Sequence, residues 1–234
     1  MAAERGSMAL GIVVGVDEAG RGSLVGELVV AGFAVEESRE EELLSLGVRD
    51  SKELSPAARM ELYREISGIG FFTVEAIRPW EVDSENINVL VTRAVEEILS
   101  RIISYLGVQP SLVVVDKYGD VQGLRLALRR LGIEPWSLVV EEKADARYPV
   151  VSAASIVAKV VRDARLRVLR RMYGVRGSGY PSDPETREWV REVFARGEAP
   201  SFIRYTWSTV KKLGGPWRGK KTGRSRRLDE FLGG

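Results

Sequence analysis

The sequence predicts an α/β fold with a mixed β-sheet, followed by a small helical part and a basic tail. Three observations predict it. Short β-prone apolar runs come first, such runs then alternate with helix-period segments, and the composition becomes basic and glycine-rich after Pro200. Over the 234 residues, 44% are hydrophobic and 29% are charged, which is typical of a globular protein and too polar for a membrane protein.

The first half of the chain predicts three strands and two helices. Residues 12–16 form an apolar run typical of a strand buried on both faces, and 28–35 predicts a second strand antiparallel to it. Ser55 and Pro56 are typical of a helix start, and 71–77 predicts a third strand. A long amphipathic helix is expected to begin at Asp83 or Ser84 and to end at Gly107.

The second half alternates strands with helices. A buried strand over 112–115 ends on Asp116, and a helix over 124–131 and a strand over 137–140 follow. Two further helices are predicted over 151–173 and 183–195, the first with an apolar seam of Val157, Val161, Ala164, Val168 and Met172. The expected division is a main α/β domain over 9–199, then a helical segment with a flexible basic tail over 200–234 that includes Arg204.

The chain has no cysteine and no histidine. This composition excludes disulfides, thiolate nucleophiles, histidine-based triads and ordinary zinc or copper sites. Catalysis would have to use carboxylates, Lys, Tyr, Ser or Thr, or a metal held by oxygen. The net charge is only +2, so nucleic acid would be attracted by local basic patches rather than by the whole molecule. No signal-peptide pattern or membrane-length apolar run is seen, and we expect a cytoplasmic protein.

Acidic residues follow the predicted buried strands. Asp17 and Glu18 come after the first strand, Asp116 ends a later one, and Asp145 lies just past the next. If the strands 12–16 and 112–115 are neighbours, their carboxylates meet at one sheet edge. Four clustered carboxylates repel one another unless divalent ions lie among them, and Mg²⁺ or Mn²⁺ prefers such oxygen ligands. Two metals about 4 Å apart can promote phosphodiester hydrolysis.

Other interpretations of these acids stay open at this point. Asp17 to Gly22 could be a solvated loop, and Asp116 or Asp145 taken singly could be a capping or turn acid. A dinucleotide-binding loop fits poorly, because the third glycine is Gly26 where that pattern requires position 25.

Several motifs in order carry a resemblance to a known family. They are Asp17-Glu18-Ala19-Gly20-Arg21-Gly22, Asp50-Ser51-Lys52, Asp116, Lys143-Ala144-Asp145 with Tyr148-Pro149, Ser152 to Lys159, Gly177-Ser178-Gly179-Tyr180-Pro181, and Arg204 with Trp207-Ser208-Thr209. The chain resembles the type 2 ribonucleases H, and most of all their archaeal branch, over roughly residues 10 to 213. The resemblance implies a ribonuclease H-like fold, with a central mixed sheet flanked by helices.

The resemblance also implies an activity. It is the metal-dependent cleavage of the RNA strand of RNA–DNA hybrids, and cleavage 5′ of single ribonucleotides embedded in duplex DNA, leaving a 3′-hydroxyl and a 5′-phosphate. Asp17, Glu18, Asp116 and Asp145 match the catalytic set that holds two Mg²⁺ or Mn²⁺ ions. Gly20-Arg21-Gly22 matches the turn whose backbone meets the ribonucleotide 2′-hydroxyl. Tyr180 matches the tyrosine on the sugar at the RNA-to-DNA junction, although a half-buried core tyrosine is the alternative.

Cationic side chains are candidate phosphate contacts. We expect Arg21, Lys52 and Lys143 to bind the nucleic-acid backbone, with solvated surface charge as the alternative for Lys52. A basic face of the long helix, formed by Arg162, Arg165 and Arg170, is expected to be solvated.

The C-terminal tail carries a candidate partner motif. Leu228, Phe231 and Leu232 have the spacing of one helical turn that docks into a hydrophobic pocket. This resembles the motif by which replication proteins bind the sliding clamp, but Ser225 replaces the usual glutamine and Leu232 the usual aromatic residue. The alternative is a short amphipathic stretch at a disordered chain end that binds no partner. The expected oligomeric state, by resemblance, is a monomer.

Two other functions are weighed against this one. A non-catalytic hybrid-binding or clamp-associated adaptor would gain nothing from uncompensated carboxylates that face phosphates. A ribonuclease H of another type, or a general nuclease, would not need Gly20-Arg21-Gly22 together with Tyr180. The sequence therefore favours the type 2 specificity.

Overall fold

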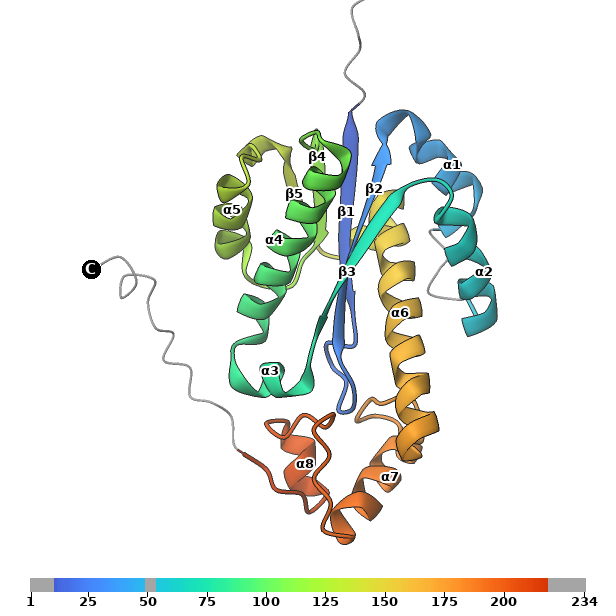
Figure 1. Ribbon diagram of the computed structural model, residues 1–234, viewed down its shortest axis with the longest axis vertical. Coiled ribbons are helices and arrows are strands. Elements are labelled where there is room, and N and C mark those ends of the chain that lie inside the picture. The colour runs from blue at the N-terminus through green and yellow to red at the C-terminus, as the bar shows by residue number, and fades with distance from the viewer. Residues whose placement is uncertain (1–10, 49–53, 219–234) are drawn as a thin grey trace, which may run out of the picture.

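A five-stranded mixed sheet organises the chain, whose computed structural model describes residues 11–48 and 54–218 (Figure 1). The strand order is β3-β2-β1-β4-β5. Strand β2 runs antiparallel to β1 and β3, whereas β1, β4 and β5 are parallel. The strand bounds are β1 Ile12–Ala19, β2 Leu28–Glu36, β3 Phe71–Ile77, β4 Leu112–Asp116 and β5 Leu138–Glu141. The predicted α/β fold and the pairing of the two acid-ended strands are confirmed.

The predicted helices follow the strands in the expected order. The helix bounds are α1 Glu40–Ser45, α2 Pro56–Ile66, α3 Pro79–Ser84, α4 Ile87–Leu106, α5 Val121–Arg130, α6 Pro149–Tyr173, α7 Pro184–Ala195 and α8 Ser208–Lys212. The short helices α1 and α3 were not predicted. Short 3-10 turns are η1 Glu37–Arg39, η3 Pro135–Ser137 and η4 Ala144–Ala146. Ser55 caps α2 and Asp183 caps α7 through their side chains, as their sequence positions predict. Within the described ranges, no helix has the length and apolar character needed to cross a bilayer.

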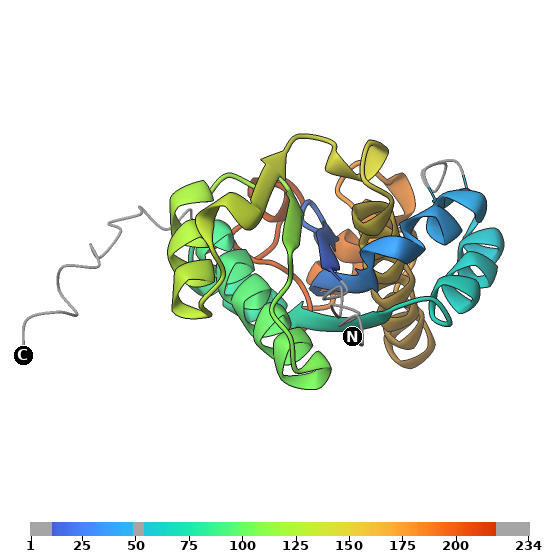
Figure 2. The same ribbon diagram turned by 90° about the horizontal axis from the view of Figure 1, so that it is seen from above.

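The helices cover both faces of the sheet. Figure 2 shows α4 and α5 on one side and α1, α2 and α6 on the other. Each side forms its own hydrophobic cluster, because alternate residues of the central strands point to opposite faces. Val13 and Val114 pack toward α6, and Val14 and Val113 pack toward α4.

A third cluster lies beyond the end of β1, where α7 and α8 are found (Figure 1). It joins the chain after β1 to the C-terminal part through Leu24, Val25, Trp189, Ile203 and Val210. The expected boundary at 199/200 falls within this cluster. Arg204 has 0% exposure, so its placement in a solvated tail was wrong. The apolar neighbours at 202, 203 and 205 carry it into the interior.

Two predicted boundaries differ from the structure because tertiary contacts override local pattern. Strand β1 does not stop before the acids but continues through both to Ala19. The long helix begins after Asn86, which caps α4, and not at Asp83 or Ser84. Asp83 instead lies in α3, buried, and accepts hydrogen bonds from the backbone N–H groups of Tyr205 and Thr206 at 2.7 and 2.9 Å.

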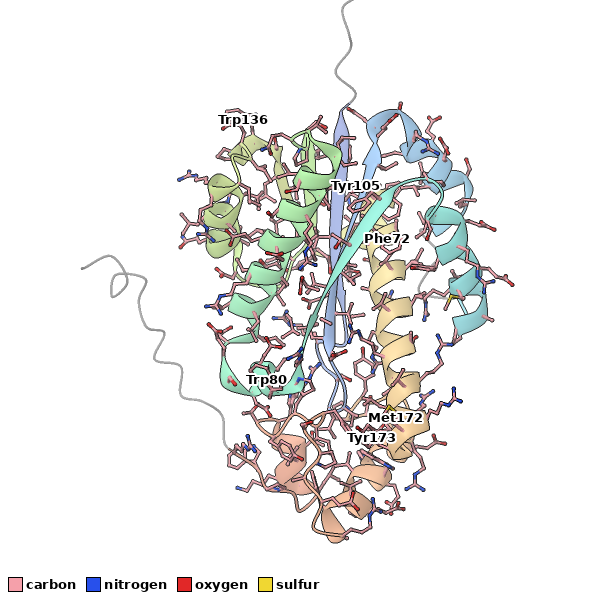
Figure 3. The ribbon with its side chains drawn as sticks, in the orientation of Figure 1. Phe72, Trp80, Tyr105, Trp136, Met172 and Tyr173 are labelled. Carbon is pink, nitrogen blue, oxygen red and sulfur yellow. The ribbon has the colours of Figure 1, made fainter. Side chains whose placement is uncertain are left out.

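The apolar seam predicted for α6 holds only in its first half. Val157 is buried, but Val168 and Met172 are 55% and 65% exposed, and Met172 points outward in Figure 3. Leu166 and Leu169 take the inward positions at that end, because they meet the third cluster. The predicted seam was wrong beyond Ala164, because the third cluster, with α7 and α8, covers a different side of α6 there.

The close approach of α6 to β1 predicts the effect of a small substitution. A Cβ at Gly15 would lie 2.4 Å from the Val150 carbonyl carbon and oxygen, which are backbone atoms with little freedom to yield. We expect Gly15→Ala to lower the free energy of unfolding by about 1–3 kcal/mol or more. Gly68→Ala is the control, since its Cβ would meet only ordinary contact at 3.5 Å. Urea denaturation measures both; equal, small effects would contradict the packing argument.

Candidate active site

Three aspartates converge at the carboxyl ends of the parallel strands. Val16 pairs with Val115, so the next residue of each strand is Asp17 and Asp116. Asp116 Oδ1 accepts a hydrogen bond of 2.8 Å from the Ala144 N–H, which fixes the turn that contains Asp145. Asp17 and Asp145 are 9% and 6% exposed. The structure thus gathers acids from distant parts of the chain, at positions 17, 116 and 145.

Burial dominates the electrostatics of Asp17. Burial is the largest cause that raises the pKa of Asp17 to about 7, against the opposing effects of the Ser155 hydroxyl and the Glu18 N–H. The charges of Asp116 and Asp145 contribute to the same rise, which shows that they lie close enough to repel the Asp17 carboxylate. A site in which acids destabilise one another's charge favours the binding of a cation.

Glu18 points away from Asp17, as expected for adjacent residues of a continuous strand. Its carboxylate accepts two hydrogen bonds from Arg21 Nη1, at 2.9 and 3.2 Å. Burial raises the pKa of Glu18 although Arg21 opposes the shift, and the charge of Asp116 also raises it. Arg21 further donates to Asn88 and to the Tyr118 carbonyl, so its guanidinium is already engaged on this side of the sheet.

The predicted four-carboxylate cluster is therefore only partly assembled. Among the residues that the structure describes, no group of three or more acidic side chains is arranged to hold a metal ion. The donor chemistry nevertheless fits a hard divalent cation, because the carboxylates offer oxygen ligands and the charge of Asp116 raises the pKa of both Asp17 and Glu18. Binding would require these side chains to turn toward the ion.

The Gly20–Gly26 turn lies against the loop that carries Tyr180. Gly20 has φ +89°, and a Cβ there would lie 2.8 Å from the Glu27 carbonyl oxygen, so glycine is required. A Cβ at Gly22 would lie 3.8 Å from the Tyr180 ring, so the ring lies beside the turn with room for about one methyl group between them. The N–H groups of Leu24 and Val25 both donate to the Gly179 carbonyl, at 2.7 and 3.1 Å.

Arg204 supports this turn from the interior. It donates from Nη1 to the Arg21 carbonyl at 2.8 Å and from Nη2 to the Gly26 carbonyl at 3.1 Å. Burial, with the nearby charge of Arg162 as a smaller cause, lowers the pKa of Arg204 to about 10. Sequence reasoning matched Arg204 to a family motif but missed this role; its apolar neighbours were the available signal.

The other predicted basic contacts have mixed outcomes. Lys143 is exposed beside Asp145 and has φ +57°, the only non-glycine residue in the described chain with positive φ. Arg165 and Arg170 are exposed as expected, but Arg162 is 8% exposed, so its assignment to a solvated face was wrong. The predictions for Lys52 and for Leu228, Phe231 and Leu232 lie outside the described residues.

Comparisons with known proteins agree on one family. The sequence model of the family "Ribonuclease HII" matches residues 14–210. The chain is 87% identical to the ribonuclease HII of Aeropyrum pernix over 225 residues, covering 96% of this chain and 100% of that protein.

Solved structures agree with this assignment. The ribonuclease H2 of Pyrococcus horikoshii OT3 is similar with a TM-score of 0.77 and 37% identity, over 86% of this chain and 96% of that one. The ribonuclease HII in a complex with PCNA from Archaeoglobus fulgidus has a TM-score of 0.76 and 38% identity, over 94% and 100% of the two chains.

The raised pKa of Asp17 predicts a pH-dependent stability. The unfolded chain loses this proton near pH 3.8, whereas the folded protein keeps it up to about pH 7. The folded state therefore binds more protons between these values, and in metal-free buffer the free energy of unfolding should fall as pH rises from 4 to 7. The loss attributable to Asp17 is at most about 4 kcal/mol.

Asp17→Asn should remove most of this dependence, since the amide cannot ionise. Urea titrations at several pH values, with chelator present, measure the slope for wild type and variant. Glu97→Gln, on the exposed face of α4, is the control that should keep the wild-type slope. Identical slopes for wild type and Asp17→Asn would contradict the assignment.

Proposed function

This chain belongs to the ribonuclease HII family, and from that premise we propose how it acts as a type 2 ribonuclease H. Enzymes of this type are endonucleases that degrade the RNA of RNA–DNA hybrids. We further propose that it cuts 5′ of a single ribonucleotide embedded in duplex DNA and leaves a 3′-hydroxyl and a 5′-phosphate.

One observation carries the finer proposal: the Tyr180 ring lies beside the Gly20–Gly22 turn, 3.8 Å from the position that a Cβ of Gly22 would occupy. A ribonucleotide has one feature that DNA lacks, its 2′-hydroxyl, and a backbone turn can hydrogen-bond that group without reading the base. An aromatic ring beside the turn can pack on the next sugar, which in a DNA–RNA–DNA strand has no 2′-hydroxyl. The pair would recognise an RNA-to-DNA junction.

Asp17, Glu18, Asp116 and Asp145 are the residues that would hold two divalent ions, Mg²⁺ or Mn²⁺. When bound, such ions supply Lewis-acid activation of water and stabilise the leaving oxygen in phosphodiester hydrolysis. The carboxyl of Asp17 must be ionised to act as a ligand, so its raised pKa links the site to pH. Glu18 would have to release Arg21, which would leave that guanidinium available to a phosphate.

Basic groups beside the site would orient the substrate. Lys143 is exposed next to Asp145, on a turn whose backbone is held by Asp116. Together with Arg21, and with Lys52 by its place in the sequence motif, it would contact backbone phosphates without base specificity. This division, with phosphate contacts for affinity and the turn with Tyr180 for selection, suits an enzyme that must act at any sequence.

A cleavage assay tests the reaction, the site and the specificity together. The substrate is a labelled DNA duplex with one internal ribonucleotide, incubated with Mg²⁺ or with chelator. We expect one metal-dependent cut 5′ of the ribonucleotide. Asp116→Asn should lose at least about 100-fold in rate, since even partners of metal ligands cost 10–100-fold. Glu97→Gln, with its exposed side chain, should cut like wild type.

Other outcomes would point elsewhere. Cleavage of a long hybrid but not of the single ribonucleotide would remove the junction specificity and leave a ribonuclease H. Cleavage of plain DNA would indicate a general nuclease. Binding of both substrates without cleavage would favour a non-catalytic adaptor.

We also propose that the C-terminal tail docks on a replication sliding clamp. The support is the sequence pattern of Leu228, Phe231 and Leu232 and the likeness to a ribonuclease HII whose complex with PCNA has been solved. These three apolar side chains, on one helical turn, could enter a hydrophobic pocket. The departures at Ser225 and Leu232 predict an affinity lower than that of a complete motif.

Deletion of residues 225–234 should abolish clamp binding. Calorimetry with PCNA from Archaeoglobus fulgidus measures the affinity, and Leu228→Ser with Phe231→Ser should weaken it by at least about 30-fold, as for interface anchor residues. Cleavage of the ribonucleotide substrate in the absence of clamp should be unchanged by the deletion. Equal affinities for full-length and shortened chains would rule out this docking segment.

A further inference from the structure

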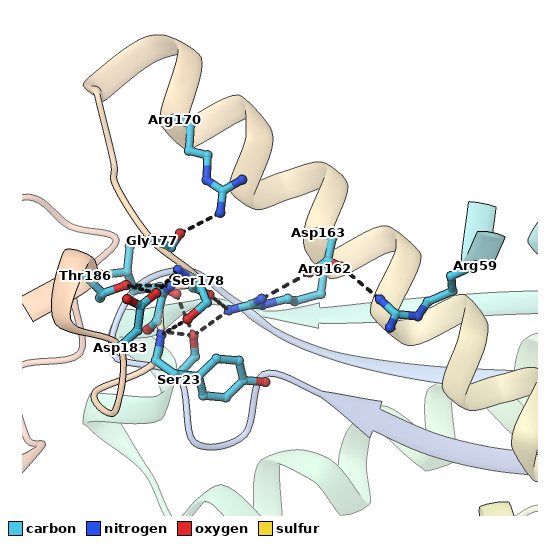
Figure 4. Close-up of polar contacts among 12 residues, drawn as sticks. Ser23, Arg59, Arg162, Asp163, Arg170, Gly177, Ser178, Asp183 and Thr186 are labelled. Carbon is cyan, nitrogen blue, oxygen red and sulfur yellow. Dashed lines mark hydrogen bonds and ion pairs between the residues drawn. The ribbon is translucent and has the colours of Figure 1, made fainter. Parts of the chain in front are cut away.

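A buried arginine of α6 connects the two elements that would recognise the ribonucleotide. Arg162 is 8% exposed, although it lies in a helix segment rich in surface arginines. Its Nη2 donates to the Ser23 hydroxyl at 3.1 Å and to the Ser178 carbonyl, and its Nη1 donates to Asp163 Oδ1 at 3.1 Å (Figure 4). One guanidinium therefore joins the Gly20–Gly26 turn to the loop before Tyr180.

The same side chain packs against the backbone of both elements. A Cβ at Gly20 would lie 3.5 Å from Arg162 Cγ, and one at Gly179 would lie 2.9 Å from Arg162 Nη2. The aliphatic part of the Arg162 side chain thus lies along the turn, and its guanidinium lies next to the loop. Larger residues at these two positions would displace it.

The guanidinium also faces the ring of Tyr180. Arg162 Cζ lies 4.7 Å from the ring centroid, within the range of a cation–π interaction. Tyr180 is half-buried, and a Cβ at Gly22 would lie 3.8 Å from its ring. Arg162, which also holds the turn through Ser23, is therefore placed to set the orientation of the ring relative to the turn.

The loop is fixed independently of Arg162 at its other end. Asp183 accepts hydrogen bonds from the N–H groups of Ser178 and Glu185, and Thr186 Oγ1 accepts one from the Gly179 N–H at 2.9 Å (Figure 4). These bonds hold the backbone of the loop on α7. None of these bonds involves the ring of Tyr180, whereas the guanidinium of Arg162 contacts it.

We infer that Arg162 is a positioning residue that holds Tyr180 against the Gly20–Gly22 turn and so sets the preference for an RNA-to-DNA junction over a continuous hybrid. This rests on the function proposed above. In a continuous hybrid the next sugar carries a 2′-hydroxyl, so no junction is available for Tyr180 to select. Loss of Arg162 should therefore impair cleavage at a single ribonucleotide more than cleavage of a hybrid.

Lysine cannot replace arginine here. A lysine would keep the charge, but a single ammonium cannot reach Ser23, Ser178 and Asp163 in the planar geometry of a guanidinium. Arg162→Lys therefore keeps the positive charge but loses the planar set of hydrogen bonds. Because the charge is kept, it is the variant that best preserves the fold.

The experiment compares two substrates for each variant of the full-length protein with Mg²⁺. The measured quantity is the ratio of kcat/KM for a DNA duplex with one ribonucleotide to kcat/KM for a continuous RNA–DNA hybrid. We expect Arg162→Lys to lower this ratio about tenfold, the size of a lost cation–π and orientation effect. Arg165→Met is the matched control, because Arg165 is exposed on the same helix and pairs with Glu27; its ratio should stay within about twofold of wild type.

A double-mutant cycle tests whether Arg162 acts through Tyr180. Tyr180→Ala should lower the ratio by itself, and adding Arg162→Lys should lower it no further, because the ring to be positioned is gone. Additive effects would overturn the inference. A purely structural role would lower both rates equally and leave the ratio unchanged, which would also overturn it.

NMR spectroscopy of Tyr180 tests its contact with Arg162 independently of catalysis. The ring resonance of Tyr180, assigned by its absence in Tyr180→Phe, should shift in Arg162→Lys and stay in place in Arg165→Met. An unshifted resonance in folded Arg162→Lys would contradict the contact. If wild type cuts hybrids but not the single ribonucleotide, the proposed specificity fails and the inference fails with it; if wild type cuts both and the ratio does not move, only the inference fails.

Discussion

The parallel pairing of β1 with β4 is the interaction on which the site depends. It places Asp17 and Asp116 at the same sheet edge, and the hydrogen bond from the Ala144 N–H to Asp116 adds Asp145 to them. Helix α6 lies close over β1 at this point, an approach that the glycine at position 15 permits. A change in the register of one residue would turn Asp17 to the opposite face and separate the acids.

The second element of the site is built from long-range contacts rather than from local turn structure. The Gly20–Gly26 turn is held by the carbonyl of Gly179, by Arg204 and by Arg162, which come from three later parts of the chain. Two buried guanidiniums at one turn are costly to desolvate, and the charge of Arg162 lowers the pKa of Arg204. Such a cost is typical of a site in which geometry matters more than stability.

The charged side chains at the candidate site are only partly paired with one another. The aspartates repel one another on one side of β1, while Glu18 is paired with Arg21 on the other. The side chains that would bind cations are thus partly engaged with the protein itself, and substrate and metal would replace these partners. Such an exchange would allow a chain with a net charge of only +2 to bind a polyanion locally, as its proposed function requires.

By itself the sequence determined the fold class, most strand and helix positions, the candidate acids and the resemblance to type 2 ribonucleases H, because apolar period, caps and motifs are local signals. Tertiary structure alone decided the direction of Glu18, the burial of Arg162 and Arg204, and the role of Asp83. Arg162, Arg204 and Asp83 each depend on a partner more than 60 residues away. The direction of Glu18 follows instead from the continuation of β1 through both acids. A sequence pattern reports how polar a residue is, whereas its burial depends on which distant segment supplies hydrogen bonds.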